Sequence, residues 1–381
     1  MVFTVYQKIH ILVQTASIAI ALLLCISCGN ISIVPTAPKT HDNSALAKIE
    51  TDIAEALSNA ETDVDFSFAV EREDGRRFVF NKGLSSMNTQ YESASTSKMV
   101  TATIILSLVD RGLLSLDSKP QDLIPAVYWP INSSDTLYGI SLRSLLCFTS
   151  GLVTTPLFSA DYGPLDSPVG TMQNTVRLIA LSNANNGEIP FTKFWYSSTH
   201  LQVAGLMAVS ACSSLGFTSW KQIFNDFKTR TGLFPDAKYD LPSETNPRLA
   251  GGMHWTGNEY LNFLRAYYFR MILQPSTHIA AISDQLTNGI TTPYAGSPIK
   301  VALSQDWHYG FGIWLECTNT VFNGDMQGYS SPGAYGAYPF LNTTHKFFGV
   351  IARQGAPVTF EKGYLLYQSI MPLVIQWANT K

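Results

Sequence analysis

Ser95 and Lys98 are the residues whose types and spacing most directly suggest chemistry. A serine hydroxyl is a weak nucleophile until a neighbouring base takes its proton. Positions three apart on a helix share one face, so Lys98 can reach the Ser95 hydroxyl if a helix begins at Ser95. The positive end of the helix dipole and burial both disfavour a charged lysine there, which favours a neutral lysine that acts as a base. The alternative is a solvated lysine at a helix start, because Ser-x-x-Lys also recurs by chance.

The flanking segments predict elements that would position this pair. An extended segment, residues 91–93, precedes Ser95, and the apolar stretch over residues 99–109 predicts a long buried helix over Ser95–Arg111. Apolar and polar residues alternate over residues 64–70, and Asp74-Gly75 separates this run from residues 77–80, which predicts a β-hairpin.

Other periodic segments lie near the two ends of the chain. Helices are predicted over residues 44–59 and 360–379, and strands over residues 309–315 and 346–352. The middle of the chain mixes helical stretches with loops rich in Gly, Pro, Ser and Asn. We therefore expect an α/β (α+β) fold, in which an antiparallel β-sheet built from both chain ends is flanked by helices and carries an inserted, mostly helical subdomain.

Further short motifs follow Ser95 in a fixed order. They are Leu142–Leu152 ending in Thr-Ser-Gly-Leu, Tyr196-Ser197-Ser198, Ala250-Gly251-Gly252, Tyr309-Gly310-Phe311-Gly312 and Ser331-Pro332-Gly333. Together with Ser95-x-x-Lys98, this ordered set resembles the serine β-lactamase and penicillin-binding protein superfamily, in the branch of class C β-lactamases, DD-peptidases and esterases. The resemblance covers residues 46–378 and implies the β-lactamase/transpeptidase-like fold.

The resemblance implies a role for each matching residue. Ser95 would be acylated by the substrate carbonyl, and Lys98 and Tyr196 would share the proton transfer, with either of them as the acylation base. The backbone N–H groups of Ser95 and Ala334 would form the oxyanion hole. Gly333 would let its strand pass close to the substrate. The implied enzyme is a serine hydrolase that acts through an acyl-enzyme on ester, amide or β-lactam carbonyls.

Two substrate-binding positions depart from the family pattern. Ser198 stands where the family has Asn, and Ser331 stands where it has a Lys or His that helps to bind a substrate carboxylate. Esters and neutral amides are therefore favoured, while a cell-wall peptidase acting on peptidoglycan peptides and a β-lactamase remain alternatives. A catalytically impaired binding or scaffold lipoprotein is the alternative from another class.

Composition narrows the classes of function. The 381 residues are 46% hydrophobic and 14% charged, which favours a packed protein, and the net charge of −3 without a basic run argues against nucleic-acid binding. The sequence has neither a phosphate-binding nor a dinucleotide-binding glycine loop, and its histidines lack metal-ligand spacing, so no cofactor and no metal are expected. Cys147, Cys212 and Cys317 are expected to be small buried residues, although one disulfide is an alternative.

The amino terminus is typical of an export signal. Lys8 is the only formally charged residue in residues 1–27, and the apolar stretch Ala16–Ile26 is shorter than a membrane-spanning helix. Ser27-Cys28 resembles a lipoprotein processing site, with Cys28 as the lipidated residue. We thus expect a signal peptide over residues 1–27, a linker over 28–45 and a hydrolase domain over 46–381. The protein would be a periplasmic-side or cell-surface lipoprotein bound to a membrane by its lipid, or otherwise secreted or periplasmic.

Overall fold

The structure is a computed structural model that describes residues 43–380 apart from residues 154–163, 185 and 288. The predicted signal peptide and Cys28 lie outside the described residues, as does most of the predicted linker. Ser44–Lys381 cluster as one unit, and the description below concerns this unit alone.

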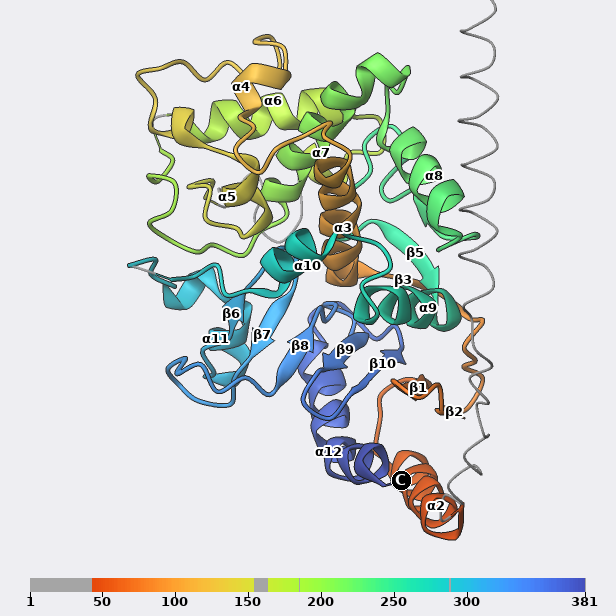
Figure 1. The fold of residues 1–381 in the computed structure, drawn as a ribbon. Coiled ribbons are helices and arrows are strands. Elements are labelled where there is room, and N and C mark those ends of the chain that lie inside the picture. Colours follow the sequence, from red (N-terminus) through yellow and green to blue (C-terminus); the bar gives the residue numbers. More distant parts are fainter. Residues whose placement is uncertain (1–42, 154–163, 185, 288, 381) are drawn as a thin grey trace, which may run out of the picture. The chain divides into compact units, whose positions relative to one another are not determined.

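Strands from the two ends of the chain pair directly in the main β-sheet (Figure 1). Strand β1 pairs antiparallel with the late strand β10, with Phe68 opposite Ile351. The sheet order is β2-β1-β10-β9-β8-β7-β6, so the N-terminal hairpin extends a meander from the C-terminal third. These strands are β1 (Ser67–Arg72), β2 (Arg77–Asn81), β6 (His308–Tyr309), β7 (Trp314–Glu316), β8 (Gly328–Ser330), β9 (Tyr338–Asn342) and β10 (Phe347–Ala352). The predicted sheet from both chain ends is confirmed.

A second, smaller sheet lies beside the segment that carries Ser95. It has the order β3-β5-β4, with strands β3 (Gln90–Glu92), β4 (Lys238–Tyr239) and β5 (Met253–Thr256). All its pairings are antiparallel, and Tyr91 lies opposite Trp255. This sheet joins the chain just before Ser95 to residues more than 150 positions later in the sequence.

Helices lie at both ends of the described chain and between the sheet-forming segments. They are α2 (Asn43–Asn59), α3 (Ser97–Asp110), α4 (Pro120–Leu123), α5 (Leu142–Leu146), α6 (Met172–Asn183), α7 (Thr199–Ala211), α8 (Trp220–Thr231), α9 (Gly257–Tyr268), α10 (Pro275–Ile282), α11 (Pro298–Leu303) and α12 (Phe360–Asn379). Short 3₁₀ turns occur at η1 (Ala94–Thr96), η2 (Thr136–Gly139), η4 (Pro164–Asp166), η5 (Cys212–Leu215) and η6 (Tyr294–Gly296). The predicted helices at residues 44–59 and 360–379 are both present.

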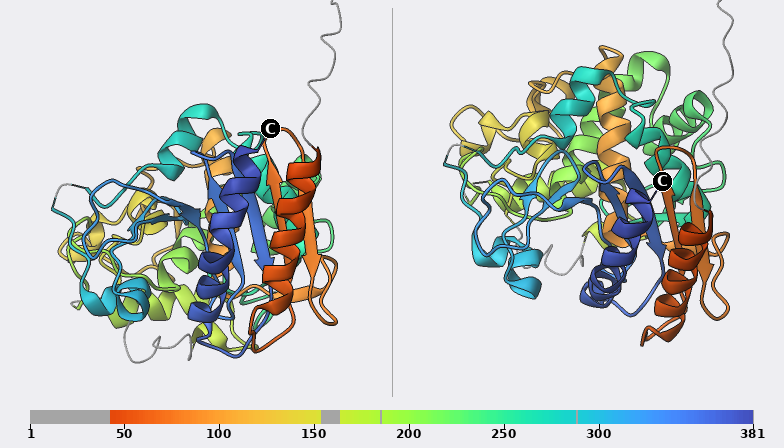
Figure 2. Two further views of the ribbon diagram at one scale, coloured as in Figure 1. Left: turned by 90° about the horizontal axis from the view of Figure 1, so that it is seen from below. Right: turned by 60° about the horizontal axis from the view of Figure 1, so that its bottom comes forward.

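The two terminal helices cover one face of the main sheet. Figure 2 shows α2 and α12 side by side over the strands, and the Trp377 Nε1 of α12 donates a 2.9 Å hydrogen bond to Glu50 of α2. Helix α9 packs on β9 and β10 from the other face. Its start is fixed by a capping box between Thr256 and Glu259, whose side chains each accept from the other residue's backbone N–H.

Helix α3 is the central helix of the unit (Figure 1). Every residue from Ser97 to Leu108 is buried, which agrees with the predicted buried helix. A helix that is apolar all round must be covered on all sides, and α7 is one of the elements that cover it. This burial gives the residues at the start of α3 a fixed place between the sheet and the helical region.

The strand predicted over residues 309–315 is wrong. The chain turns back within this segment, so that His308 pairs with Leu315 and Tyr309 with Trp314 in an antiparallel β6–β7 hairpin. The turn needs Gly312, which has a φ of +74° and lies so close to α3 that a Cβ atom would be 2.7 Å from the Lys98 carbonyl oxygen. The apolar residues that suggested one strand are buried on both arms of the hairpin.

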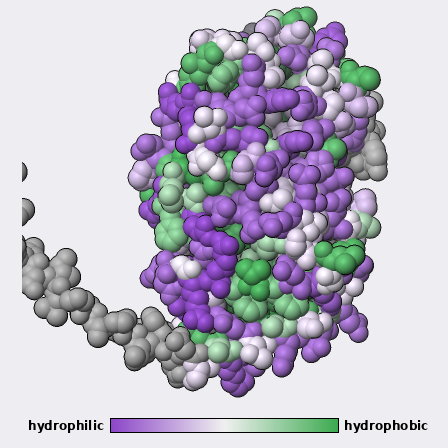
Figure 3. All heavy atoms as spheres, turned by 90° about the vertical axis from the view of Figure 1, so that its right-hand side faces the viewer, coloured by the Kyte–Doolittle hydropathy of each residue, from purple (hydrophilic) through white to green (hydrophobic). Residues whose placement is uncertain are grey.

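The helices of the described residues can be compared with the length and hydropathy of a membrane span. Within the described ranges, no single helix is long and apolar enough to cross a membrane, and one pair, Thr199–Leu215 with Trp220–Thr231, meets the criteria only together and across a 72° bend. On the face drawn in Figure 3, hydrophilic residues predominate and hydrophobic ones form small separate patches. Cys147, Cys212 and Cys317 are buried free thiols, as the packing interpretation expected.

Candidate active site

Ser95 lies in a tight turn between β3 and α3. The α-helix begins at Ser97, two residues later than predicted, because residues 94–96 form the 3₁₀ turn η1. Ala94 adopts a φ of +42°, an uncommon value for a residue with a Cβ atom, and the backbone N–H of Thr96 donates to the Ser93 carbonyl at 3.2 Å. Backbone strain of this kind is found where surrounding contacts hold a functional residue in place.

Buried hydrogen bonds fix this turn from several elements. Thr96 Oγ1 donates to the Ser93 carbonyl oxygen (2.9 Å) and accepts from the Trp255 indole (2.9 Å). The Tyr260 hydroxyl of α9 donates to the Thr96 carbonyl oxygen at 2.8 Å. Thr96, Trp255 and Tyr260 are fully buried, so the turn that carries Ser95 has little room to move. These contacts could not be predicted from the sequence, because Trp255 and Tyr260 lie about 160 positions after Thr96 in the chain.

Lys98 extends from the first turn of α3 to the Ser95 hydroxyl. Its Nζ lies 2.8 Å from Ser95 Oγ and 3.1 Å from the carbonyl oxygen of Ala250. The side chain is only 3% exposed, while Ser95 itself is partly open to solvent. The structure therefore brings together the two residues that the spacing singled out. Ala250 belongs to the Ala-Gly-Gly motif found in the sequence, but its contact with Lys98 was not foreseen.

Tyr196 completes the group around Lys98. The Lys98 Nζ lies 4.6 Å from the centroid of the Tyr196 ring, within cation–π distance. The ring stacks on Trp314 of β7 at 5.0 Å and meets the edge of Phe148. The Tyr196 backbone N–H donates to the Gly296 carbonyl. Trp314 thus positions the tyrosine, a role that the sequence alone did not separate from ordinary packing.

His200 is a structural residue of this region. Its Nδ1 is 2.8 Å from Ser150 Oγ, and its Nε2 is 2.7 Å from the carbonyl oxygen of Trp195. Burial lowers its pKa to about 4, an effect that the backbone bond to Trp195 opposes and the Lys98 charge reinforces. Both ring nitrogens are used within the fold, so His200 holds the segment just before Tyr196, in agreement with the structural interpretation of this lone histidine.

The segment Ser331–Gly336 closes the site from the connection between β8 and β9. Ser331 is buried, and its hydroxyl lies 3.4 Å from the Ser95 carbonyl oxygen. A Cβ atom on Gly333 would lie 2.7 Å from the Ser93 carbonyl oxygen, so glycine allows this segment to pack against the Ser95 turn. Gly333 was expected to let its strand pass close to the substrate. In the structure it packs closely against the backbone just before Ser95.

Two backbone N–H groups predicted to form the oxyanion hole, those of Ser95 and Ala334, have no backbone acceptor in the described residues. Ala334 is partly exposed and is anchored through its carbonyl oxygen, which accepts from the Thr359 N–H at 2.8 Å. Such amides next to a serine hydroxyl can stabilise negative charge on a substrate oxygen.

Ser198, the remaining histidines and Cys28 complete the set of residues considered from the sequence. Ser198 is buried at the N-cap of α7, two residues after Tyr196. His254 and His308 pair with Asp240 and Asp284, and no three His, Cys, Asp or Glu side chains in the described ranges are arranged to hold a metal ion. Cys28 lies outside the described residues. A buried lysine at hydrogen-bonding distance from a partly exposed serine, with amides that have no backbone acceptor, is an arrangement suited to acyl transfer.

Solved structures with this fold include several hydrolases. A Bacteroides dorei protein assigned as a β-lactamase is 25% identical, with a TM-score of 0.66 over 88% of this chain and 99% of that one. The hydrolase EstCE1, which has promiscuous acyltransferase activity, is 16% identical with a TM-score of 0.67 over 86% and 99% of the two chains. The D-amino acid amidase of Ochrobactrum anthropi is 16% identical with a TM-score of 0.62 over 87% and 99%.

The family itself follows from the sequence. A comparison with curated proteins gave no match. The family model for β-lactamases matches residues 68–367, which is most of the chain and includes Ser95, Lys98, Tyr196 and Ser331. The resemblance inferred from the ordered motifs is therefore confirmed, and the chain belongs to the β-lactamase family.

Proposed function

We propose that the protein is a serine hydrolase in which Ser95 forms an acyl-enzyme with an ester or amide substrate. The observation that carries the proposal is the 2.8 Å separation between Lys98 Nζ and Ser95 Oγ at a site that is buried around the lysine. A neutral lysine at this distance can take the serine proton as the hydroxyl attacks the carbonyl carbon. The Ser95 and Ala334 amides would bind the oxyanion of the tetrahedral intermediate.

Tyr196 would share the proton transfer. Its ring lies against both the Lys98 Nζ and Trp314, so its position is set by packing. The proton taken from Ser95 would pass to the leaving alcohol or amine, and the acyl-enzyme would then be hydrolysed by water. Such groups titrate together, so the pair rather than either residue acts as the base.

Neutral esters and amides are the favoured substrates. Ser331, which is buried with its hydroxyl 3.4 Å from the Ser95 carbonyl oxygen, stands in the motif where the resemblance implies a cation for a substrate carboxylate. A neutral hydroxyl attracts a carboxylate much less than an ammonium group does. The fold neighbours include an amidase and a hydrolase with acyltransferase activity as well as β-lactamases and penicillin-binding proteins, so the choice of substrate rests on Ser331.

Intact-mass spectrometry of the domain from residue 44 would test the proposal. The protein is treated separately with a fluorophosphonate, activated esters, amino-acid amides and penicillins, with Ser95→Ala as the control. We expect each reactive reagent to give a mass adduct on the wild type that is absent from Ser95→Ala. With esters or amides, this acyl adduct should disappear again as it is hydrolysed. A folded protein that no reagent labels would contradict the proposal and favour a non-catalytic binding protein. Rapid turnover of penicillins would instead make it a β-lactamase.

A variant can test the role given to Ser331. Ser331→Lys introduces the missing cation, and we expect it to raise turnover of carboxylate-bearing substrates relative to their neutral esters. Because Ser331 is buried, the variant's folding must be checked by its thermal unfolding. A folded Ser331→Lys protein with an unchanged preference would show that this position does not select against carboxylates.

We also propose that lipidation of Cys28 tethers the exported protein to a membrane. The motif at residues 27–28 supports this, and the same motif makes the prediction testable in cells. Growth with a labelled lipid precursor should label the wild-type protein and leave Cys28→Ala unlabelled. A Cys28→Ala protein that keeps its label would rule out this attachment site.

A further inference from the structure

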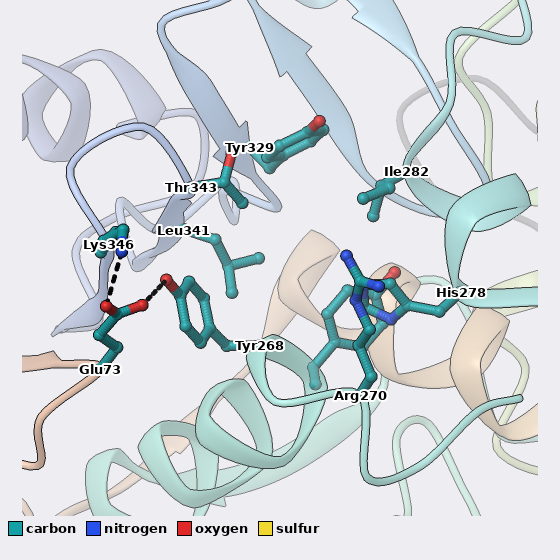
Figure 4. Close-up of a pocket in the computed structure, with 10 residues that line it drawn as sticks. Glu73, Tyr268, Arg270, His278, Ile282, Tyr329, Leu341, Thr343 and Lys346 are labelled. Carbon is teal, nitrogen blue, oxygen red and sulfur yellow. Dashed lines mark hydrogen bonds and ion pairs between the residues drawn. The ribbon is translucent and has the colours of Figure 1, made fainter. Parts of the chain in front are cut away.

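A second cavity lies apart from Ser95, beside the ends of α9 and α10. It has a volume of about 300 Å³, at the lower end of the range for small-molecule sites. Its walls come from α9, α10, β8, β9 and the turn before β10 (Figure 4). Neither Ser95 nor Lys98 nor Tyr196 lines it, so it is a separate feature of the fold.

The cavity carries a positive charge that the protein does not balance. Glu73 and Lys346 line one end and neutralise each other through a 2.8 Å ion pair. Arg270 lines the other end, and within the described residues no carboxylate lies within 4.0 Å of its guanidinium group. Figure 4 shows the guanidinium beside the His278 ring. Arg270 is an exposed residue, so its guanidinium lines the cavity and also meets solvent. The net local charge is thus that of one arginine.

Three buried polar side chains face the same space. His278, Tyr267 and Tyr329 line the cavity and are 5%, 2% and 8% exposed. None of their side chains forms a hydrogen bond to a described residue. Burial lowers the pKa of His278 to about 4, with the Arg270 charge in the same direction, so its ring is neutral near pH 7. Their polar atoms are not among the fully buried atoms without a partner in the described residues, so they stay accessible from the cavity and can bond a molecule inside it.

The remaining wall residues are Tyr268, Thr343 and two aliphatic side chains. Ile282 and Leu341 project into the cavity between the two polar ends (Figure 4). An arginine fork matches the two oxygens of a carboxylate in one plane. We propose that this cavity binds a small organic carboxylate, with its oxygens on Arg270 and its apolar body against Ile282 and Leu341. His278 and the tyrosine hydroxyls would complete the hydrogen bonding of the carboxylate.

Benzoate is a suitable probe, and isothermal titration calorimetry is a suitable measurement. The whole described domain is used after Ser95 has been blocked with a fluorophosphonate, so that the first site is occupied. We expect saturable benzoate binding that is about tenfold or more weaker in Arg270→Gln, because a charge-assisted hydrogen-bonded contact is lost. Arg270→Lys should keep part of the affinity. Arg177→Gln is the matched control, since Arg177 is exposed on α6 and does not line the cavity.

Tyr329→Phe is a second variant that keeps the ring and removes only the hydroxyl. It should weaken benzoate binding by a few-fold without affecting folding, so the proposal remains testable if Arg270→Gln is unstable. The absence of saturable binding to the wild-type protein would overturn the proposal, and so would equal affinity in Arg270→Gln. Equal binding of the neutral analogue benzamide would show a merely apolar cavity, and equal binding of inorganic phosphate would show an unselective anion site; either result contradicts a carboxylate site.

Discussion

Replacing Lys98 with methionine tests the central part of the proposed mechanism. Methionine has a similar length and no basic nitrogen, so the substitution removes the group 2.8 Å from Ser95 Oγ and leaves most of the volume filled. A positioned general base contributes about 10²–10⁴-fold to a rate. We therefore expect the acylation rate of Ser95 to fall by that factor, which corresponds to about 3–5 kcal/mol in the activation barrier.

The folding free energy should respond differently. Lys98→Met loses the hydrogen bonds to Ser95 and Ala250 and the cation–π contact with Tyr196. It also removes the cost of burying the polar amine of lysine in a site that is only 3% exposed. These contributions oppose each other, so we expect the free energy of unfolding to change by only about 1–2 kcal/mol. A large loss of rate with a small change in stability is typical of a residue that acts in the chemistry.

Lys228→Met is a matched control for this prediction. Lys228 of α8 also donates to backbone carbonyls, those of Pro235 and Ala237, and lies 5.1 Å from the Phe224 ring. Lys228→Met therefore loses the same kinds of contact as Lys98→Met, but on α8 and far from Ser95 in the sequence. Its labelling rate should match that of the wild type.

Two measurements decide the outcome. Intact-mass spectrometry gives the second-order rate of fluorophosphonate labelling, and urea titration gives the free energy of unfolding. A Lys98→Met protein that labels at more than about a tenth of the wild-type rate would refute the assignment of Lys98 as a base, since such a loss is below the smallest effect expected for one.

Three further predictions concern the surroundings of Ser95 and the core. Tyr196→Phe keeps every ring contact and removes the hydroxyl, so turnover should fall at least about tenfold with stability within about 1 kcal/mol of wild type; unchanged ester turnover would exclude a chemical role. Gly333→Ala places a Cβ atom 2.7 Å from the Ser93 carbonyl oxygen and should cost about 1–3 kcal/mol in urea titration and slow labelling, whereas Gly139→Ala, with its nearest contact at 3.7 Å, should do neither; equal effects would contradict the close packing. Glu316 has a pKa raised by burial, so the folded state keeps its proton above pH 4.5 where the unfolded state loses it, and this contribution to stability declines as the pH rises. Glu316→Gln should therefore gain stability over the wild type progressively above pH 4.5, and a constant difference across pH would contradict the raised pKa.

The order of secondary structure could be predicted because its signals are local. The α12 helix was predicted with the bounds Phe360–Asn379 that the structure has, and the buried run after Ser97 gave α3. The segment 309–315 could not be interpreted correctly, because a continuous apolar run fits one buried strand and a tight hairpin equally well. What decides between them is the contact of Gly312 with α3, which is a tertiary contact.

In the candidate site, too, local spacing predicts some contacts while others depend on the tertiary fold. The reach of Lys98 to Ser95 follows from helical spacing alone, and it is present although Ser95 lies in a 3₁₀ turn instead of the α-helix. The support of that turn comes from Trp255 and Tyr260, which lie about 160 residues later and carry no local signature. Sequence reasoning found the groups that react, while the groups that hold them were visible only once the chain was folded.

The separation between reacting and supporting groups bears on how substrate choice can vary in this fold. The Ser331 hydroxyl contacts the Ser95 carbonyl oxygen at 3.4 Å and the Tyr260 side chain, whereas Lys98 is held by the Ala250 backbone and by its buried place on α3. A change at Ser331 can therefore alter the recognition of a carboxylate without disturbing the group that removes the serine proton. If this is so, variants at Ser331 should change the ratio of turnover between charged and neutral substrates while the fluorophosphonate labelling rate, which needs no carboxylate contact, stays near that of the wild type.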